Sequence, residues 1–420
     1  MVDHFAVVGS GVSGLVAAHV LARRARVTVL EADSRPGGHA HTHDVPLPDG
    51  GTVRVDTGFI VHNDRTYPTL CRLFDELGIP TRPTDMSMSI YSERTHWQYA
   101  GGKGVGGVLA DPRTVVRPTF LRMLTEVRRF HSAAREFLTT ADDATLITIG
   151  DWLSDRGFST AFLDHFATPV VAAVWSCAPA DAMSYPARSL LTFLEHHGML
   201  SVSGSPSWRT VAGGSRTYVD TLLANPNIEL RCGTPVRAVV ARRDAVTVQT
   251  DRDEHDFSGV VIAAHPSAAL DMLKSPTVPQ TDVLGALRYS PNPAQLHTDS
   301  SLLPSARRAR ASWNYRLPID PRDGVLVSYD MTRLMHLPVV DGRRFIVTLG
   351  GADRVDPASV IADMTYEHPL YTAEFVRAQA RLPQIDERRI VFAGAYHGWG
   401  FHEDGAVSGK RAAEALGGAW

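Results

Sequence analysis

Gly9-Ser10-Gly11-Val12-Ser13-Gly14 is the stretch that decides the fold. The residues before it, His4 to Val8, predict a short buried strand. The residues after it, Leu15 to Arg24, are rich in Ala, Leu and Val and predict a helix. Val27 to Leu30 predicts the next strand, and Glu31 follows directly. The chain therefore opens with a βαβ unit whose first turn carries the spacing G-x-G-x-x-G.

Each glycine of this turn has a separate physical task in dinucleotide binding. Gly9 permits the tight turn, Gly11 lets the backbone approach a pyrophosphate, and Gly14 lets the helix pack closely on the strand. The helix N-terminus faces the negative charge, and Glu31 accepts hydrogen bonds from ribose hydroxyls. The alternative is a glycine turn in an unrelated α/β protein. The predicted cofactor-binding residues in this unit are Gly9, Gly11, Val12, Ser13, Gly14, Glu31 and Ala32.

Length and composition favour a two-domain protein with a small-molecule ligand. A chain of 420 residues with 44% hydrophobic content exceeds what one core usually covers. The net charge of −3 and the lack of a dense basic block argue against nucleic-acid binding. Cys71, Cys177 and Cys232 stand singly, without the spacing of a zinc site or a disulfide framework. We therefore expect no metal, and a reducing cytoplasm is the natural location.

Targeting and membrane signals are also weak. The apolar run from Phe5 to Val8 continues directly into the glycine turn, so no cleavable export signal is expected. No stretch approaches the roughly 18 to 20 apolar residues that a membrane span requires. Peripheral contact with a membrane stays open.

Sheet-forming segments recur in three separated parts of the chain. Strands are predicted at 228–230, 236–241, 245–248 and 260–264, and a last strand at 389–394 precedes a glycine-rich loop and a helix at 408–416. Helices are predicted at 120–138, 190–196 and 218–223, and a loop at 101–107. These pieces predict a discontinuous cofactor domain at 1–65, 205–265 and 385–420, with a substrate domain inserted as 66–204 and 266–384.

The residues after Glu31 carry a family resemblance. With Glu31, Arg35 and Gly37-Gly38 form E-x-x-x-R-x-G-G, which resembles the FAD-binding proteins of the flavin amine oxidase and phytoene desaturase superfamily. The resemblance implies an α/β fold with a Rossmann-type FAD-binding domain and an inserted α+β substrate domain, as in amine oxidases. It places Arg35 near the diphosphate or ribityl region and lets the paired glycines lie against the cofactor.

The segment from Phe392 to Gly409 resembles the closing element of the same superfamily, in which a glycine loop and a helix N-terminus approach the flavin. Amides and a helix dipole at that edge would stabilise the negative charge of a reduced flavin. The resemblance implies Gly394 and Asp404 as cofactor contacts, Asp404 on the ribityl side, and Gly405, Ala406 and Val407 at the flavin edge. Val236 is expected to contact the adenine. Helix capping by Asp404 or Ser408 without a ligand is the alternative.

Further segments are similar to one subfamily, predicted NAD/FAD-binding oxidoreductases whose genes neighbour cyclopropane-fatty-acid-synthase-like methyltransferases. The matching segments are 56–61, 65–68, 208–216, 296–299, 313–315 and 400–404. The resemblance implies an acyl-lipid or other small-molecule substrate and a methyltransferase partner. His62 and Gly350-Gly351 depart from the subfamily pattern and leave the substrate open.

Histidines take the place of an expected lysine. His39, His41 and His43 alternate, so in an extended segment they share one face. Either a metal site or a place beside the flavin explains that spacing. We prefer the place beside the flavin, with His39 as a cofactor contact. Superfamily amine oxidases carry a lysine near flavin N5, and the register places His297 there, which argues against ordinary amine oxidation. The candidate proton donors or substrate-positioning residues are His297, Asp299, Tyr315 and His402, and each has a structural role as its alternative.

The sequence thus predicts an FAD-dependent oxidoreductase that transfers hydride between flavin N5 and a C–C or C=C centre of a lipid-like or other biosynthetic substrate. Because no cysteine follows Cys232, FAD is expected to be non-covalent. NAD(P)H is a candidate external reductant. The alternatives are a flavin amine or amino-acid oxidase and a non-catalytic flavin-binding partner of a methyltransferase.

Overall fold

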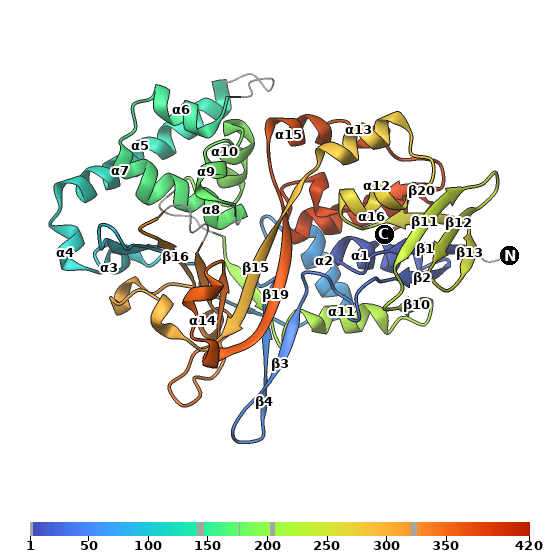
Figure 1. Cartoon of the computed structure of the whole chain (residues 1–420), viewed down its shortest axis with the longest axis horizontal. Helices are drawn as coiled ribbons and strands as arrows, with labels where there is room; N and C mark the ends of the chain where they lie inside the picture. The colour runs from blue at the N-terminus through green and yellow to red at the C-terminus, as the bar shows by residue number, and fades with distance from the viewer. Residues whose placement is uncertain (1–2, 141–146, 176, 202–205, 321–325) are drawn as a thin grey trace.

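The computed structural model describes residues 3–140, 147–175, 177–201, 206–320 and 326–420, and it divides into two lobes. The five-stranded lobe carries the N- and C-terminal segments, and the seven-stranded lobe carries most of the helices between residues 104 and 196 (Figure 1).

The five-stranded lobe is built on a parallel sheet of order β10-β2-β1-β14-β20. The chain enters this sheet in three separate parts, as the apolar segments predict, and β1 is buried along four of its five residues. Its strands are β1 (His4–Val8), β2 (Arg26–Leu30), β10 (Ile228–Arg231), β14 (Gly259–Ile262) and β20 (Ile390–Phe392). Parallel strands covered on both faces need near-continuous apolar residues, which is why sequence pattern alone locates them. The predicted domain boundaries stay a prediction.

Two helices pack together on this sheet through glycines. In α1 (Val12–Leu21), a Cβ added at Gly14 would lie 1.9 Å from the Gly9 carbonyl oxygen. In α16 (His402–Ala415), a Cβ at Gly409 would lie 2.1 Å from the Ser13 carbonyl oxygen. The helix α16 starts six residues before the predicted position, because glycines weaken the helical signal of its first turns.

This packing gives a first prediction. We expect Gly409→Ala to lower the free energy of unfolding by about 3 kcal/mol, because the backbones of α1 and α16 must separate to admit the methyl group. The control is Gly285→Ala in α13 (Val278–Ala286), where an added Cβ meets nothing within 4 Å. That change should be neutral or stabilise by up to about 1 kcal/mol. Urea denaturation of both variants makes the comparison, and equal effects would contradict the packing described.

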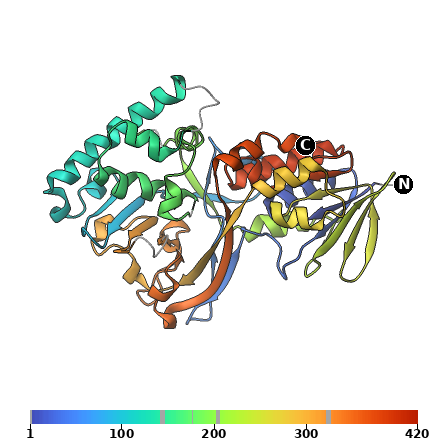
Figure 2. The same ribbon diagram turned by 45° about the horizontal axis from the view of Figure 1, so that its top comes forward.

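The seven-stranded lobe is built on a mixed sheet of order β19-β15-β18-β17-β16-β7-β8. Its longest strands, β15 (Tyr289–His297) and β19 (Val360–Pro369), are antiparallel and run side by side between the two lobes (Figures 1 and 2). The others are β7 (Met88–Ser92), β8 (Gln98–Gly101), β16 (Trp313–Leu317), β17 (Val327–Asp330) and β18 (Ile346–Leu349). The paired strands β15 and β19 therefore span the region between the two lobes.

Helices cover this second sheet and bury a cluster of aromatic rings. Phe130 of α5 (Pro118–Thr140) contacts Phe158 and Phe162 at ring-centroid distances of 6.3 and 5.6 Å. The helix α10 (Ala187–His196) confirms the prediction at 190–196. The loop prediction at 101–107 is wrong in part, because α3 (Gly104–Val108) begins inside it and its glycines hide the helical pattern.

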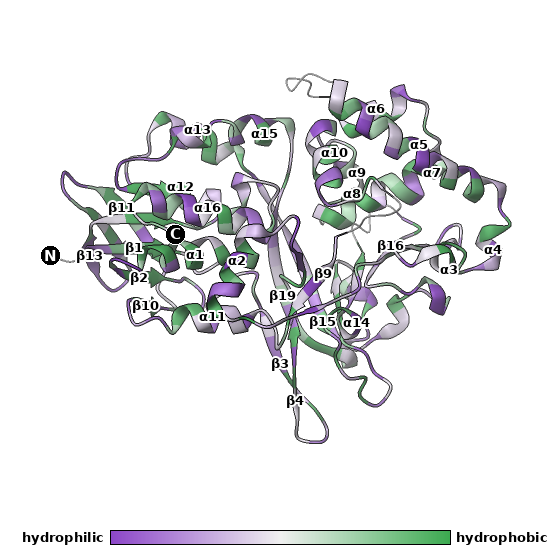
Figure 3. Cartoon of the chain, turned by 180° about the vertical axis from the view of Figure 1, so that it is seen from behind, coloured by the Kyte–Doolittle hydropathy of each residue, from purple (hydrophilic) through white to green (hydrophobic). Residues whose placement is uncertain are grey.

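The remaining elements are short and connect these two sheets. The hairpin of β3 and β4 projects away from the body of the molecule (Figures 1 and 3). A three-stranded antiparallel sheet of β11, β12 and β13 lies beside the five-stranded sheet. The bounds of the short elements are β3 (Thr42–Pro46), β4 (Thr52–Asp56), β5 (His62–Asn63), α2 (Pro68–Leu77), β6 (Thr81–Pro83), α4 (Pro112–Val115), α6 (Ile149–Asp155), α7 (Thr160–Phe162), α8 (Thr168–Trp175), α9 (Pro179–Ala182), β9 (Trp208–Val211), α11 (Arg216–Leu223), β11 (Val236–Ala241), β12 (Val246–Thr250), β13 (Glu254–Phe257), α12 (Pro266–Met272), η3 (Arg307–Ala309), α14 (Met331–Leu334) and α15 (Ala373–Gln379).

Candidate cofactor and substrate site

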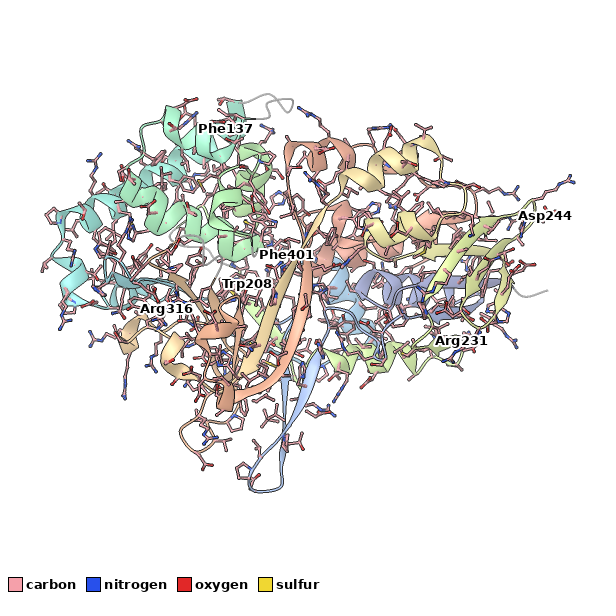
Figure 4. All side chains as sticks on the ribbon, in the orientation of Figure 1. Phe137, Trp208, Arg231, Asp244, Arg316 and Phe401 are labelled. Atoms are coloured by element: carbon pink, nitrogen blue, oxygen red, sulfur yellow. The ribbon has the colours of Figure 1, made fainter. Side chains whose placement is uncertain are left out.

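A cavity of about 930 Å³ lies where the two lobes meet. It is lined at one end by the glycine turn after β1 and at the other by residues of the seven-stranded lobe. Trp208 and Phe401 both line it, and both lie between the lobes (Figure 4). The cavity therefore joins the predicted nucleotide site to a second chamber.

The glycine turn exposes an uncapped helix end to this cavity. Gly11 is the N-cap of α1, and no side chain caps the helix there. A Cβ added at Gly11 would meet nothing within 4 Å, and Gly9, Val12 and Ser13 line the same wall. Free backbone N–H groups and the positive end of a helix dipole suit a phosphate group. These residues therefore fit the pyrophosphate of a dinucleotide.

Glu31 is held as a hydrogen-bond acceptor at the end of β2. Its carboxylate accepts from the Ser10 backbone N–H at 2.8 Å and from the Ser10 hydroxyl. It also accepts from the Asp33 N–H at 2.9 Å. Glu31 and Ala32 line the cavity, as does Val236 of β11. This arrangement suits the ribose and adenine end of FAD, and contact of the three residues with FAD stays a prediction.

The Arg35 to Gly38 loop is stabilised by its own hydrogen bonds. Arg35 Nη2 donates to the Gly38 carbonyl at 2.9 Å, and the Gly37 N–H donates to Ser10 at 3.1 Å. Gly38 lines the cavity, whereas Gly14, Arg35 and Gly37 do not. In the structure Arg35 and Gly37 shape this loop, and their direct contact with the cofactor stays a prediction.

The C-terminal element meets the cavity earlier than predicted. Gly394 and the residues from Trp399 to His402 line it, whereas the segment from Asp404 to Val407 does not. Asp404 accepts from the Phe401 N–H at 2.8 Å and so caps α16. Gly405 packs against Val12, and Val407 is 46% exposed. The structure thus brings Phe401 and His402, at the helix end, to the cavity wall, and contact of Gly405 to Val407 with a flavin stays a prediction.

The alternating histidines divide between two places. His39 lines the cavity with its ring centroid 5.0 Å from that of Tyr366. The ring centroids of His41 and His43 lie 4.1 Å apart at an interplanar angle of 35°, and neither residue lines the cavity. Burial lowers the pKa of His41 to about 3. Among the described residues, no group of three or more metal-ligating side chains comes together.

His402 is the one predicted proton-transfer residue that lines the cavity. Its ring stacks on Phe59 at 3.9 Å, and its Nε2 atom lies 3.0 Å from the Tyr218 hydroxyl. Burial lowers the pKa of His402 to about 3, so the ring is neutral near pH 7. A neutral, hydrogen-bonded ring in the wall supports a positioning role for His402.

The other three candidates lie away from the cavity. His297 is buried, and its Nε2 atom lies 2.7 Å from the Thr348 hydroxyl. Asp299 caps a short helical turn by accepting from the Ser301 N–H at 2.8 Å, and Tyr315 is buried in the seven-stranded lobe. The strand β15 reaches the cavity at Tyr289, eight residues before His297. The register that placed His297 beside the flavin therefore does not match this structure.

His297→Ala gives a test of that placement. We expect the FAD content and the rate of flavin reduction to stay within about twofold of the parent, because the side chain lies outside the cavity. The free energy of unfolding should fall by about 1 to 3 kcal/mol, since the Thr348 hydroxyl loses a buried partner. Absorption spectra and stopped-flow traces measure the first two quantities. A tenfold slower reduction would restore His297 as a candidate.

The far end of the cavity is a chamber of aromatic and other apolar side chains, and it was missed by the sequence prediction. Its members come from nine separated segments, so no local pattern unites them. The apolar chamber is lined by Tyr67, Met86, Met88, Val174, Trp175, Phe193, Met199, Trp208, Trp313, Tyr329, Leu349, Trp399 and Phe401. The buried His197 lines the cavity among them, with its ring stacked on Phe193 at 3.9 Å. The charged residues along the cavity lie nearer the other end. Glu31, Arg237 and Asp271 belong to the five-stranded lobe, and Glu367 of β19 has its Oε2 atom 2.6 Å from Nδ1 of His265, the residue before α12.

Fold and cavity together define a protein that binds a dinucleotide cofactor beside an apolar chamber. A family model described as flavin containing amine oxidoreductase matches residues 12–298. The chain belongs to this family. The predicted amine-oxidase-like fold, FAD cofactor and flavoprotein oxidoreductase class are thereby confirmed, whereas the methyltransferase-associated subfamily stays a prediction.

Curated relatives support the same family. A phytoene dehydrogenase of Streptomyces griseus is 48% identical over 324 residues, covering 71% of this chain and 60% of that protein. A protein of Mycobacterium tuberculosis described as a flavin-containing monoamine oxidase is 26% identical over 283 residues, covering 65% of this chain and 59% of that protein. The chain therefore spans about three fifths of the length of these relatives.

Solved structures share the fold over nearly the whole chain. A fatty acid isomerase from P. acnes, which produces CLA, has a TM-score of 0.70 at 14% identity and covers 99% of this chain and 98% of its own. The cyclohexylamine oxidase of Brevibacterium oxydans has a TM-score of 0.68 at 16% identity with the same coverage. At such low identity these likenesses concern the fold alone.

Proposed function

We propose that this protein is an FAD-dependent oxidoreductase that acts on a C–C or C=C centre of a lipid-like substrate. The observation that carries the proposal is the apolar chamber, whose wall has no Asp, Glu, Lys or Arg among the described residues. Burying an alkyl or alkenyl chain there is favourable by about 25 cal/mol for each Å² removed from water. When bound, FAD supplies a two-electron acceptor or donor.

The chamber wall excludes water and orients the substrate. Trp175 donates its indole N–H to the Trp399 carbonyl at 3.3 Å, which fixes two walls of the chamber relative to each other. Phe193 stacks on Phe401 at 4.9 Å. Stacked rings with few rotamers hold a shape, so a flexible chain is bound in a limited set of conformations.

A direct test is anaerobic reduction of the FAD-replete protein. Mixing with unsaturated or methylene-bearing acyl lipids should bleach the flavin absorbance if the substrate is oxidised. If the substrate is reduced, NADPH should bleach the flavin and the lipid should restore its colour. Flavin that no acyl lipid reduces or reoxidises would contradict the proposal.

A charge placed in the chamber should block the substrate without affecting FAD. We expect Val174→Lys to slow flavin reduction by acyl lipids at least tenfold, because an ammonium group in an apolar wall must stay hydrated and displaces the chain. The FAD content should be unchanged, since Val174 lies in the chamber and not at the glycine turn. Val407→Lys is the control, because Val407 is 46% exposed and outside the cavity. Equal rates in the two variants would place the reacting substrate elsewhere.

Amine oxidation is the second candidate function, favoured by the family description and by the monoamine oxidase relative. The aromatic chamber offers an ammonium group cation–π contact but no carboxylate on its described wall. Peroxide release from a panel of primary amines would support this function and contradict the first. The association with a methyltransferase stays a prediction.

A further inference from the structure

Exposed aliphatic side chains are concentrated on one face of the seven-stranded lobe. Four of the large apolar residues that face solvent fall within 17 positions of the chain, in and beside α3, α4 and the start of α5. They are Val105, Leu109, Val116 and Leu121, exposed by 73, 41, 76 and 47%. The helices α3 and α4 lie at the end of the molecule opposite the N-terminus (Figures 1 and 3). We call this surface, with η3, the α3–α5 face.

The α3–α5 face is strongly basic. Residues 103–129 and 305–311 contain nine Lys or Arg and two carboxylates, in a chain whose net charge is −3. Of the carboxylates, Glu126 is buried and accepts from the Ser159 N–H at 3.2 Å, while Asp111 caps α4 by accepting from the Arg113 N–H at 3.0 Å. Both carboxylates are therefore engaged in local structure, and the face keeps a large positive charge.

Hydrogen bonds join the two basic segments into one surface. Lys103 Nζ donates to the carbonyls of Arg308 and Arg310 at 3.0 and 2.6 Å. Gln98 of β8 lies between them, because its backbone N–H donates to the Thr114 hydroxyl and its side chain accepts from the Ala306 N–H at 3.0 Å. The cations on α4 and η3 are thus held beside the aliphatic residues of α3.

The exposed arginines of this face are available for a partner. Arg113, Arg117, Arg307 and Arg308 are exposed, and within the described ranges they form no ion pair with a carboxylate. A two-fold contact between copies would bring the same positive surface against itself, which like charges disfavour. An anionic surface with an apolar interior matches both the arginines and the aliphatic side chains.

We propose that the α3–α5 face docks the protein on an anionic lipid bilayer. The aliphatic tips would enter the boundary between headgroups and acyl chains, while the arginines stay at the phosphates. No helix among the described residues is long and apolar enough to span a membrane, so contact of this kind is peripheral. The inference is independent of the reaction at the cavity, since none of these residues lines it.

Vesicle co-sedimentation of the full chain tests the proposal. We expect binding to vesicles that contain phosphatidylglycerol, much weaker binding to pure phosphatidylcholine vesicles, and weakening by added salt. The variant Arg113→Glu/Arg117→Glu should bind at least 25-fold more weakly, about fivefold for each arginine removed. Val105→Ser/Val116→Ser should also weaken binding, by about tenfold.

Matched controls separate docking from general effects. Val278→Ser and Arg252→Glu change exposed residues on other surfaces and should bind vesicles as the parent does. All variants should keep their FAD content and their activity on detergent-dispersed substrate. Equal binding by the face variants and the controls would overturn the proposal. The proposal would also be overturned if the parent protein bound no vesicles and instead formed a dimer, or bound duplex DNA, through contacts that the face variants abolish.

Discussion

Gly11→Val should purify as a folded protein without FAD. Gly11 has a φ of −66° and ψ of 176°, which valine adopts readily, and an added Cβ meets no protein atom within 4 Å. The fold therefore accepts the side chain. The isopropyl group nevertheless projects into the cavity at the uncapped N-terminus of α1, where the pyrophosphate has to approach the backbone. We expect FAD affinity to fall at least about 100-fold, equivalent to roughly 3 kcal/mol.

The measurement is the ratio of flavin to protein absorbance after purification and after reconstitution with excess FAD. Gly285→Val is the matched control, because Gly285 also has open space around its Cβ position but does not line the cavity. That variant should retain FAD fully. Circular dichroism should show the same helix content in both variants and the parent. A flavin-replete Gly11→Val protein would mean that the cofactor does not lie against this turn.

The nucleotide end of the cavity was predictable because its information is local. A strand, a glycine turn, a helix and an acidic residue follow one another within 28 residues, and each has a recognisable pattern. Gly9, Gly11, Glu31 and Val236 all line the cavity in the structure, and their contact with FAD stays a prediction. The later strands were also found, since strands of a parallel sheet are apolar throughout.

The substrate end was not predictable in the same way. Trp175, Phe193, Trp313 and Trp399 come from four separated parts of the chain and face one chamber only after the two lobes assemble. In the sequence each is an ordinary buried aromatic residue. The error at His297 has a related cause, because a motif fixes a residue's place along β15 but not which part of that long strand reaches the cavity.

Glycine positions in α16 misled the prediction for a different reason. Glycines before a helix suggest a loop around a ligand, and on that pattern the sequence predicts a loop from Gly405 to Val407. In the structure Gly405 is helical and packs against Val12 and Ser13 of α1, where Gly409 also approaches the α1 backbone. A glycine that admits a ligand and a glycine that admits another helix have the same sequence signal.

Acid should destabilise the protein strongly, because many of its histidines are buried in the neutral form. Burial lowers the pKa of His41, His397 and His402 to about 3, and that of His62, His131, His197, His297 and His368 to about 4. When folding lowers the pKa of a histidine, its contribution to the free energy of unfolding is greatest at pH values above 6.5, the pKa in the unfolded chain. That stabilisation is lost as the pH falls toward the folded value, since the unfolded chain takes up the proton first.

Two carboxylates act in the opposite direction. Burial raises the pKa of Asp56 and Asp404 from 3.8 to about 6, so their protonated forms stabilise the fold below pH 3.8, and this contribution is lost as the pH rises to 6. The neutral histidines outnumber these two carboxylates. We therefore expect the free energy of unfolding to fall by several kcal/mol between about pH 7.5 and about pH 5.

His397→Gln isolates one such histidine. His397 lies outside the cavity, and its Nε2 atom is buried without a hydrogen-bond partner among the described residues. Between about pH 7.5 and about pH 5, the free energy of unfolding of the parent should fall by about 2 kcal/mol more than that of the variant. The reason is that only the unfolded chain protonates His397 in this range, which costs about 1.4 kcal/mol for each pH unit below 6.5. His255→Gln is the control, since the His255 side chain is 47% exposed. Urea denaturation of the FAD-replete proteins at both pH values measures the difference. If the free energy of unfolding changed equally with pH in all three proteins, His397 would take up its proton in the folded state, and water would reach its side chain.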